Sequence, residues 1–368
     1  MKKIRVGIIF GGKSAEHEVS LQSAKNVIGA IDKTRFEPVL IGIDKQGQWH
    51  LTEAENYLLN AHDPKLIALN KSNDNVLIAP GATENQLMAS HKQNSDGRID
   101  VAFPILHGPC GEDGLVQGLL KLANIPFVGA SVLGSAVGMD KDVMKRLLRD
   151  AGIPVADFIT VTRTQKNNVT FAFVKDKFGL PVFVKPANMG SSVGISRVDT
   201  EAHFLTAVEE AFMYDRKVII EECIYGREIE CSVLGNENPA ASLPGEVISN
   251  AAKHGFYSYE AKYIDENGAT LKIPADLDQQ TVKKVQALAV TTFKVLCCEG
   301  MARVDFFLKQ DGQIFVNEIN TIPGFTNVSM YPKLWEATGK GYTALITELI
   351  ELALERHKEE RALKTTVC

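Results

Sequence analysis

The chain has 368 residues, an ordinary globular composition and a formal net charge of −5. This length predicts two or three domains with ample core, and the negative charge argues against a protein that binds nucleic acid or a membrane surface. No apolar run reaches the roughly 18 residues that a membrane span needs, and the apolar run over residues 6–10 is too short for a signal peptide.

The six cysteines show no metal-ligand spacing and no framework of paired residues. Such cysteine usage is typical of a reducing compartment, so we expect a cytoplasmic protein.

Residues 1–138 read as an open parallel α/β domain. Residues 4–43 have the pattern strand, Gly-Gly loop, helix, strand, which is a βαβ unit. After a polar stretch without clear pattern over residues 50–98, a buried strand, IDVAFPIL, leads to His107 in the loop HGPCGEDG, then to a helix and a short strand over residues 126–130. Ligands of such sheets bind at the carboxyl ends of the strands, and both Glu16 and His107 lie just past such ends.

Residues 7–14, GIIFGGKS, match the phosphate-loop pattern of nucleotide hydrolases. That loop must follow its strand, whereas Ile8, Ile9 and Phe10 belong inside the strand. No apolar strand ending in a magnesium-binding Asp accompanies it. A phosphate-loop NTPase is therefore the alternative function from a different class of protein, and not the preferred one.

Residues 139–225 form a second predicted domain. A helix capped by Asp140 is followed by a strand that ends at Lys185, the loop NMGSSVG and a second strand. Small residues let main-chain N–H groups approach phosphates closely, so this loop is predicted to cover a nucleotide as a lid. The alternative is a plain hairpin with a flexible turn.

Residues 226–368 form the third predicted domain, which begins after a connector between the strands VIIEE and EIECSVL. Glu221 and Glu228 flank this connector and could accept hydrogen bonds from an amino group or a ribose hydroxyl, although exposed glutamates are common. Residues 250–268 have no clear period and are predicted to form a long, mobile loop at the site.

The sequence MARVDFFLKQDGQIFVNEINTIPG, residues 301–324, predicts a β-hairpin. Asp311-Gly312 between two β-rich runs favours a two-residue turn with both residues at positive φ. This turn pairs Asp305 with Glu318. A four-residue turn centred on the same dipeptide would keep this pair, whereas a loop of odd length would break it.

The same register pairs Arg303 with Asn320, so these four polar side chains share one face. The other face is predicted to be core and consists of Val304, Phe306, Leu308, Phe315 and Ile319.

The Cβ atoms of opposed residues lie roughly 4.5–5.5 Å apart, and two carboxylates placed so closely need a cation or a shared proton. Oxygen ligands favour Mg²⁺, and Arg303 suits a phosphate or an oxyanion. The alternative is a solvated face with a surface ion pair.

In this order the motifs resemble the ATP-grasp ligases and, within them, the D-alanine–D-alanine ligases in their longer, A-type form. The resemblance covers nearly the whole chain and is carried by GGKSAEHEVS, HGPCGEDG, MDK, KPANMGSSVGISRV, EAKY, GMARVDFF and VNEINTIPGFT. It implies the three-domain ATP-grasp fold, an α/β (α+β) architecture in which ATP lies between two mainly antiparallel sheets.

The resemblance also implies roles for individual residues. The catalytic residues are Glu16, Ser191, Tyr263, Arg303 and the main-chain amide of Gly324. The residues implied to bind the two D-alanine substrates are His107, Ser329 and Met330. The residues implied to bind ATP are Lys141, Lys185, Glu221, Cys223, Ile224, Glu228 and Lys262. The residues implied to bind two Mg²⁺ or Mn²⁺ ions are Asp305, Glu318 and Asn320.

In the family, a tyrosine at the position of Tyr263 accompanies attack by an amine and a dipeptide product. We therefore expect D-alanyl-D-alanine synthesis for peptidoglycan precursors. The resemblance also implies a homodimer that associates through the first domain. Another carboxylate–amine ligase, or a D-alanine–D-lactate ligase, is the alternative within the same architecture.

Overall fold

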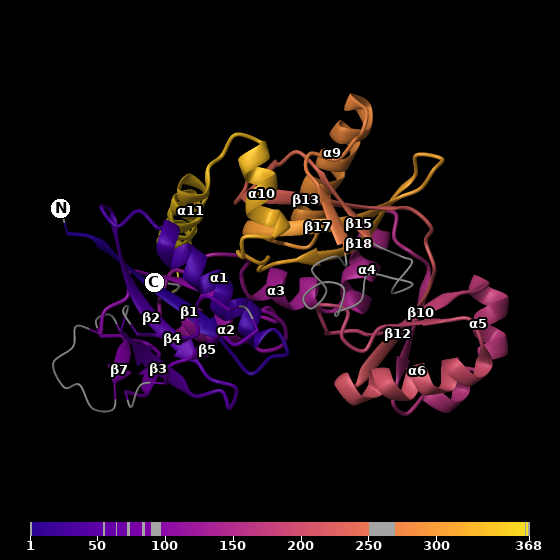
Figure 1. The fold of residues 1–368 in the computed structure, drawn as a ribbon, viewed down its shortest axis with the longest axis horizontal. Coiled ribbons are helices and arrows are strands. Elements are labelled where there is room, and N and C mark those ends of the chain that lie inside the picture. Colours follow the sequence, from indigo (N-terminus) through magenta and orange to yellow (C-terminus); the bar gives the residue numbers. More distant parts are fainter. Residues whose placement is uncertain are drawn as a thin grey trace.

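The computed structural model describes residues 2–53, 56–63, 65–71, 74–82, 85–89, 97–249, 269–364 and 366. Lys262, Tyr263 and the loop predicted over residues 250–268 lie outside the described residues. Three main sheets follow one another along the chain, and Figure 1 shows them from left to right as the N-terminal, C-terminal and central sheets.

The N-terminal sheet has the strand order β3-β2-β1-β8. Its strands are β1 (Ile4–Gly11), β2 (Phe36–Ile43), β3 (Trp49–Thr52) and β8 (Val101–Ile105). The predicted parallel sheet is confirmed for β1, β2 and β8, whereas the edge strand β3 is antiparallel to β2. The short strand predicted over residues 126–130 is wrong, because this segment makes only one parallel bridge, between Phe127 and Ala102.

The phosphate-loop interpretation of residues 7–14 is excluded by β1. Gly7, Ile8, Ile9 and Phe10 all pair with β2 inside the sheet. Their main-chain N–H groups therefore cannot wrap a phosphate.

The polar stretch over residues 50–98 adds two small hairpins beside this sheet. They consist of β4 (Leu58–Leu59) with β5 (Ala68–Leu69), and β6 (Val76–Ile78) with β7 (Leu87–Ala89).

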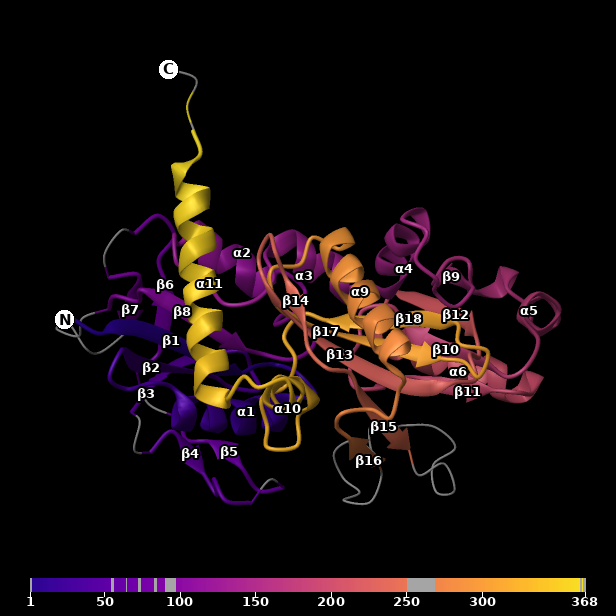
Figure 2. The same ribbon diagram turned by 90° about the horizontal axis from the view of Figure 1, so that it is seen from above.

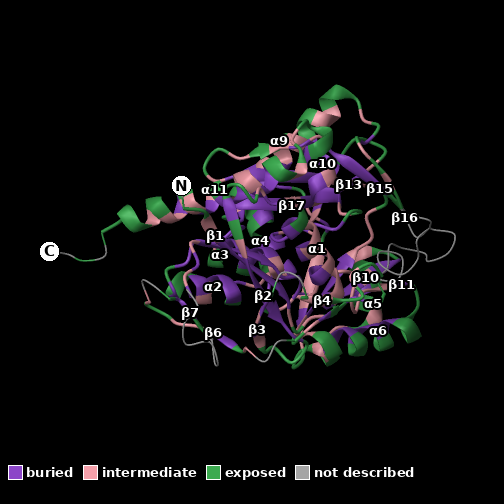
Figure 3. Cartoon of the chain, turned by 60° about the vertical axis from the view of Figure 1, so that its left-hand side comes forward, coloured by how far each residue is buried: buried purple, intermediate pink, exposed green. Residues whose placement is uncertain are grey.

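Helices from both ends of the chain cover the N-terminal sheet. They are α1 (His17–Ala30), α2 (Leu115–Leu122) and α11 (Tyr342–Ala362). One apolar core joins β1, β8 and α1 to Leu345, Ile346 and Leu349 of α11. Figure 2 shows α11 lying across the N-terminal sheet, and Figure 3 shows that its C-terminal end is exposed.

The central sheet is antiparallel, with the order β11-β10-β12-β9. Its strands are β9 (Phe158–Thr162), β10 (Val182–Pro186), β11 (Ser196–Val198) and β12 (Lys217–Glu222). One face packs against α5 (Phe171–Phe178) and α6 (Glu201–Tyr214), and a short 3₁₀ helix, η1 (Lys166–Asn168), precedes α5. The predicted hairpin around the glycine-rich loop is confirmed as β10 and β11.

Strand alternation in the central sheet separates core from polar residues. Val184 and Ile220 lie in the apolar core under the helices. Lys185 and Glu221 are their neighbours in sequence and therefore project from the opposite face.

The C-terminal sheet has the order β16-β15-β13-β17-β18, with β14 beside β13, within the residues that the structure describes. Its strands are β13 (Arg227–Gly235), β14 (Ala240–Ala241), β15 (Gly245–Ser249), β16 (Ala269–Lys272), β17 (Gly300–Leu308) and β18 (Ile314–Asn320). The accompanying helices are α3 (Val132–Met139), α4 (Lys141–Asp150), α9 (Gln279–Val295) and α10 (Met330–Ala337). Asp140 caps α4 as predicted, because its carboxylate accepts hydrogen bonds from the main-chain N–H groups of Asp142 and Val143.

The hairpin of β17 and β18 differs from the prediction at its turn. Lys309 N–H donates to Gln313 O at 2.9 Å, which leaves a three-residue loop, and only Gly312 of the Asp-Gly pair has positive φ (+83°). A β-bulge at Asn317 then shifts the register by one residue. The predicted pair Asp305 with Glu318 is confirmed because the bulge compensates for the odd loop.

The bulge also corrects one core assignment. Phe315 pairs with Phe307 and is half-buried, whereas Val316 pairs with Phe306 and lies in the core. The predicted core residues Val304, Phe306, Leu308 and Ile319 are buried.

No helix in the described ranges is long and apolar enough to cross a membrane.

Candidate active site

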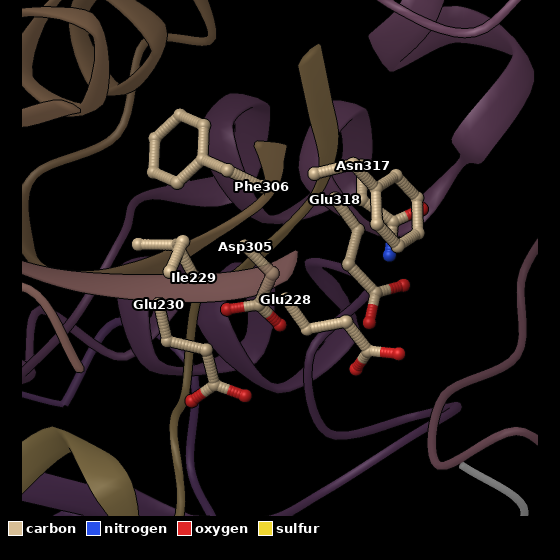
Figure 4. Close-up of a pocket in the computed structure, with 8 residues that line it drawn as sticks. Glu228, Ile229, Glu230, Asp305, Phe306, Asn317 and Glu318 are labelled. Carbon is tan, nitrogen blue, oxygen red and sulfur yellow. The ribbon is translucent and has the colours of Figure 1, made fainter. Parts of the chain in front are cut away.

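Four carboxylates line one pocket on the face of the C-terminal sheet. Asp305 lies opposite Glu318 on β18 and opposite Glu230 on β13. Glu228 lies two residues before Glu230 on β13 and shares its face. Figure 4 shows the four acidic groups pointing to the same side, while the side chains of Ile229 and Phe306 point away. The prediction that Asp305 and Glu318 face one cleft is confirmed.

Arg303 neutralises part of this acidic face. Its Nε and Nη2 atoms donate to the two carboxylate oxygens of Asp305, both at 2.7 Å, and Nε lies 2.9 Å from Glu230 Oε2. Burial acts to lower the pKa of Arg303, but Asp305 and Glu230 raise it well above its usual value. The guanidinium is therefore a fixed positive charge.

The donor set suits a hard divalent ion, but the present contacts must rearrange to hold one. Within the described ranges, no three His, Cys, Asp or Glu side chains converge on a common point. Asp305 instead pairs with Arg303 and accepts from Asn320 Nδ2 at 3.0 Å, and Glu318 Oε2 lies 3.2 Å from Lys141 Nζ. Carboxylate and amide oxygens facing one space are still ligands that Mg²⁺ prefers.

Buried lysines stand opposite the carboxylates. Lys141 Nζ donates to Met189 O of the glycine-rich loop at 2.7 Å, in addition to its contact with Glu318. Lys185 donates to Glu221 Oε1, and Lys145 Nζ lies 3.2 Å from Glu221 Oε2. Burial acts to raise the pKa of Glu221, but Lys145 and Lys185 lower it to about 2.

The connector between β12 and β13 leads from these lysines to the acidic face. Cys223 and Ile224 are half-buried, and Glu228 lines the same pocket as Glu318. The predicted nucleotide-binding residues of the connector therefore lie between the lysines and the carboxylates along the chain.

The glycine-rich loop contacts Glu16, the residue that precedes α1 in the first domain. Ser191 Oγ donates to Glu16 Oε1, and a side chain at Gly190 would place its Cβ 3.3 Å from Glu16 Oε2. Ser191 and Ser192 have φ values of 50° and 60°, a left-handed conformation that costs about 1–2 kcal/mol per residue. The contact of Ser191 with Glu16 holds the loop over the site.

His107 and Glu112 hold the main chain that follows β18. His107 Nδ1 lies 3.1 Å from Ile322 O, so this nitrogen donates and carries a proton. The two oxygens of Glu112 accept from Gly108 N–H at 2.7 Å and from Ile322 N–H at 3.3 Å. Ile322, the second residue after β18, is thus bound through both its N–H and its C=O.

Both side chains have altered acidity. Burial lowers the pKa of His107, so its ring is neutral and its buried Nε2 has no hydrogen-bond partner in the described part of the chain. Burial, followed by the charge of Glu16, raises the pKa of Glu112 to about 8.

The segment around Gly324 meets the start of α10. A Cβ at Gly324 would lie 2.7 Å from Ser329 Oγ, and Ser329 Oγ accepts from Thr326 N–H at 2.9 Å. The side chain of Met330 is buried with Val247 in a small apolar cluster.

The sequence analysis did not assign three residues of this site, although the sequence contains a feature that points to each of them. Glu230 lies two residues from Glu228 and shares its face of a strand. Lys145 lies one helical turn after Lys141. Glu112 belongs to the loop that contains His107, although its contact with Ile322 depends on the fold.

Comparison with known proteins identifies the family. The family model described as D-ala D-ala ligase N-terminus matches residues 5–130, and D-ala D-ala ligase C-terminus matches residues 147–351. The D-alanine–D-alanine ligase of Shouchella clausii is 59% identical over 367 residues (100% of this chain, 99% of the relative), and D-alanine–D-alanine ligase A of Escherichia coli K12 is 58% identical (100% of both chains).

Solved structures agree. The D-alanine–D-alanine ligase from Coxiella burnetii has a TM-score of 0.84 and 40% identity, covering 98% of this chain and 97% of its own. The VanG D-Ala:D-Ser ligase from Enterococcus faecalis has a TM-score of 0.83 and 35% identity, covering 96% and 100%. The chain therefore belongs to the D-alanine–D-alanine ligase family, and its three sheets form the ATP-grasp fold.

Proposed function

We propose that this enzyme joins two D-alanine molecules to D-alanyl-D-alanine, with ATP converted to ADP and phosphate, as a step in peptidoglycan precursor synthesis. The observation that carries the proposal is the acidic face of Asp305 and Glu318 opposite buried lysines, in a chain of this family. Carboxylates for metal ions and lysines for phosphates are what a phosphoryl transfer requires.

The first step activates the carboxylate of the first D-alanine. One carboxylate oxygen attacks the γ-phosphorus of ATP, the bond from that phosphorus to the β,γ-bridging oxygen breaks, and ADP leaves. The product is D-alanyl phosphate. Lys141, Lys185 and, outside the described residues, Lys262 neutralise phosphate charge, which is most of what this transfer needs from the protein.

The second step forms the peptide bond. The amine of the second D-alanine attacks the acyl carbon, the developing oxyanion is stabilised by Arg303 and Gly324 N–H, and phosphate leaves as the amine loses a proton. Glu16 binds the ammonium of the first D-alanine, and His107 lies near the carboxylate of that molecule. Ser329, with the main chain of Met330, binds the carboxylate of the second D-alanine.

Two Mg²⁺ or Mn²⁺ ions would be held by Asp305, Glu318 and Asn320. When bound, they neutralise the phosphate oxygens on which negative charge accumulates. Arg303 would then turn from Asp305 toward the acyl group, and Lys141 from Glu318 toward the γ-phosphate.

The nucleotide base and ribose are assigned to Glu221, Glu228 and the main chain of Cys223 and Ile224. Lys185 reaches the phosphates from the same strand pair. The connector supports this assignment, because Cys223 and Ile224 are half-buried and Glu228 lines the same pocket as Asp305 and Glu318.

Water must be excluded, because acyl phosphates hydrolyse. The bond from Ser191 to Glu16 supports a closed glycine-rich loop. Tyr263, outside the described residues, is assigned as the third member of this group and as the residue that favours an amine acceptor over a hydroxyl acceptor.

The deciding experiment measures phosphate release from ATP and Mg²⁺ with D-alanine or L-alanine, followed by the mass of the product. We expect phosphate release with D-alanine but not with L-alanine, and a product with the mass of D-alanyl-D-alanine. D-Serine and D-lactate are offered as second substrates, because the VanG relative is named a D-Ala:D-Ser ligase. A mixed product formed in preference to the dipeptide of D-alanine would contradict the proposal, as would ATP hydrolysis that needs no amino acid.

The enzyme is further proposed to be a cytoplasmic homodimer with domains over residues 1–138, 139–225 and 226–368. Large apolar side chains exposed on the first domain support association there: Leu77, Leu115, Leu122 and Leu133. Replacing Leu115 and Leu133 with Lys should yield a monomer in sedimentation, and an unchanged dimer would contradict this interface.

A further inference from the structure

Lys145 is a buried lysine that has no role in the proposed reaction. It lies on α4, its side chain is 1% exposed, and its Nζ is 3.2 Å from Glu221 Oε2. Within the part of the chain that the structure describes, Nζ makes no hydrogen bond of good geometry. Burial alone would favour the neutral amine, so Glu221 is the group that makes its charge tolerable.

Glu221 is shared by two lysines from different elements. Its Oε1 accepts from Lys185 of β10, and its Oε2 faces Lys145 of α4. The carboxylate is itself buried, with Glu221 2% exposed. Each of its two oxygens therefore has one cationic neighbour.

The region has more buried positive than negative charge. Lys141, Lys145 and Lys185 are 6%, 1% and 7% exposed, and two carboxylates face these three lysines: the buried Glu221, and Glu318, which lies 3.2 Å from Lys141 Nζ. Leaving a buried charge without a counter-ion is strongly unfavourable. The excess is explained if a polyanion enters and draws Lys141 and Lys185 toward itself.

Departure of Lys185 would leave Glu221 with one cationic partner. We propose that Lys145 is a positioning residue for the nucleotide base: it keeps Glu221 ionised and aimed at the base while Lys185 binds the phosphates. This inference rests on the proposed function. An ionised Glu221 accepts a hydrogen bond from an exocyclic amino group, as in adenine, and repels a carbonyl at the same position, as in hypoxanthine.

The test compares ATP with ITP, which carries a carbonyl in place of the adenine amino group. The variants are Lys145→Met, which removes the charge, and Lys145→Arg, which keeps it. Lys284→Met, on the exposed side of α9, is the matched control. The quantity measured is the ratio of kcat/KM for ATP to kcat/KM for ITP, together with the KM for D-alanine.

In Lys145→Met we expect the ATP-to-ITP ratio to fall by at least about tenfold, because loss of a charged hydrogen bond has this size. The KM for D-alanine should change by less than about twofold, and Lys145→Arg should recover most of the ratio. If kcat/KM falls equally for ATP and ITP, so that their ratio is unchanged, Lys145 has only a structural role and the inference is overturned.

Binding separates failure of this inference from failure of the proposed reaction. ADP and IDP affinities, measured by calorimetry without amino acid, require no turnover. If wild-type protein binds ADP more tightly than IDP and Lys145→Met does not, the inference holds even where no dipeptide is formed. Lys145→Gln serves the same comparison if the Met variant fails to fold, and an unchanged preference in a folded variant refutes the inference.

Discussion

Asp305 illustrates how one side chain can serve two states of a site. In the structure it is bound by Arg303 through two hydrogen bonds of 2.7 Å. Opposite it, Glu318 is held near Lys141 at 3.2 Å. These ion pairs compensate two opposed carboxylates without a metal, and each pair must open before an ion can bind.

We predict that Asp305→Asn and Glu318→Gln each lower kcat by about 10²–10³-fold, the usual effect of removing one charge-stabilising group. The fold should be retained, since both side chains face the cleft. Asp311→Asn, at the exposed turn of the same hairpin, is the control and should be neutral. Phosphate release decides the matter, and wild-type rates in either site variant would contradict the metal assignment.

The pKa of Glu112 gives a prediction for stability without metal or nucleotide. Its value is raised from 4.5 to about 8 in the folded protein, so the folded state binds more protons than the unfolded state between these limits. The free energy of unfolding of wild type, relative to Glu112→Gln, should therefore fall as pH rises from about 5 to about 8 and level off above. Urea unfolding of both proteins across this range tests it. A difference that does not vary with pH would show that Glu112 titrates normally.

At the scale of the element, the β17–β18 hairpin has two irregularities whose effects on register cancel. The loop has three residues, and Asn317 is an additional residue in β18. Pairing of β17 with β13 on its other edge continues through this region from Arg227 to Gly235. The register at Asp305 is therefore stabilised by the sheet and not by the turn alone.

Deletion of Gln310 should consequently be tolerated. It shortens the loop to the two-residue Asp-Gly turn and leaves the pairs of Leu308 with Ile314 and of Asp305 with Glu318 unchanged. We expect kcat within about twofold of wild type, since exposed loops accept deletions. A loss of phosphate release as large as that of Asp305→Asn would mean that the turn sets the register.

At the scale of the whole molecule, the last helix returns to the first sheet. Arg356 of α11 donates to Phe127 O and Gly129 O at 2.7 and 2.6 Å and stacks over the Phe127 ring at 4.7 Å. Gly129 in turn lies beside the start of β17, where a Cβ added at Gly300 would come within 3.1 Å of Gly129 N. Packing of the N-terminal sheet is thereby connected to the strand that carries Arg303 and Asp305.

Arg356→Met should lower the free energy of unfolding by about 2–4 kcal/mol, because two buried carbonyls lose a charged donor. Arg361→Met, exposed near the end of the same helix, should change it little. Urea unfolding measures both, and equal stability of the two variants would indicate that Arg356 contributes only packing.

Sequence alone determined the classes of element and the face that carries the chemistry. Strand-like runs predicted β10, β12, β17 and β18, and alternation put Arg303 and Asp305 on one face, because strand periodicity is a local property. The pair of Asp305 with Glu318 was predicted from a two-residue turn; the pair is confirmed, but the loop has three residues. The motifs in chain order indicated the family and so the assigned site residues.

Tertiary structure decided what local pattern cannot encode. Asn317 forms a bulge in β18, so that Val316 lies in the core and Phe315 does not. Lys145, Glu112 and Glu230 joined the site through partners 76, 210 and 73 residues away in sequence, Glu221, Ile322 and Arg303. Charges that distant are brought together by packing of whole elements, and their acidity then follows from burial and from the neighbours that the fold supplies.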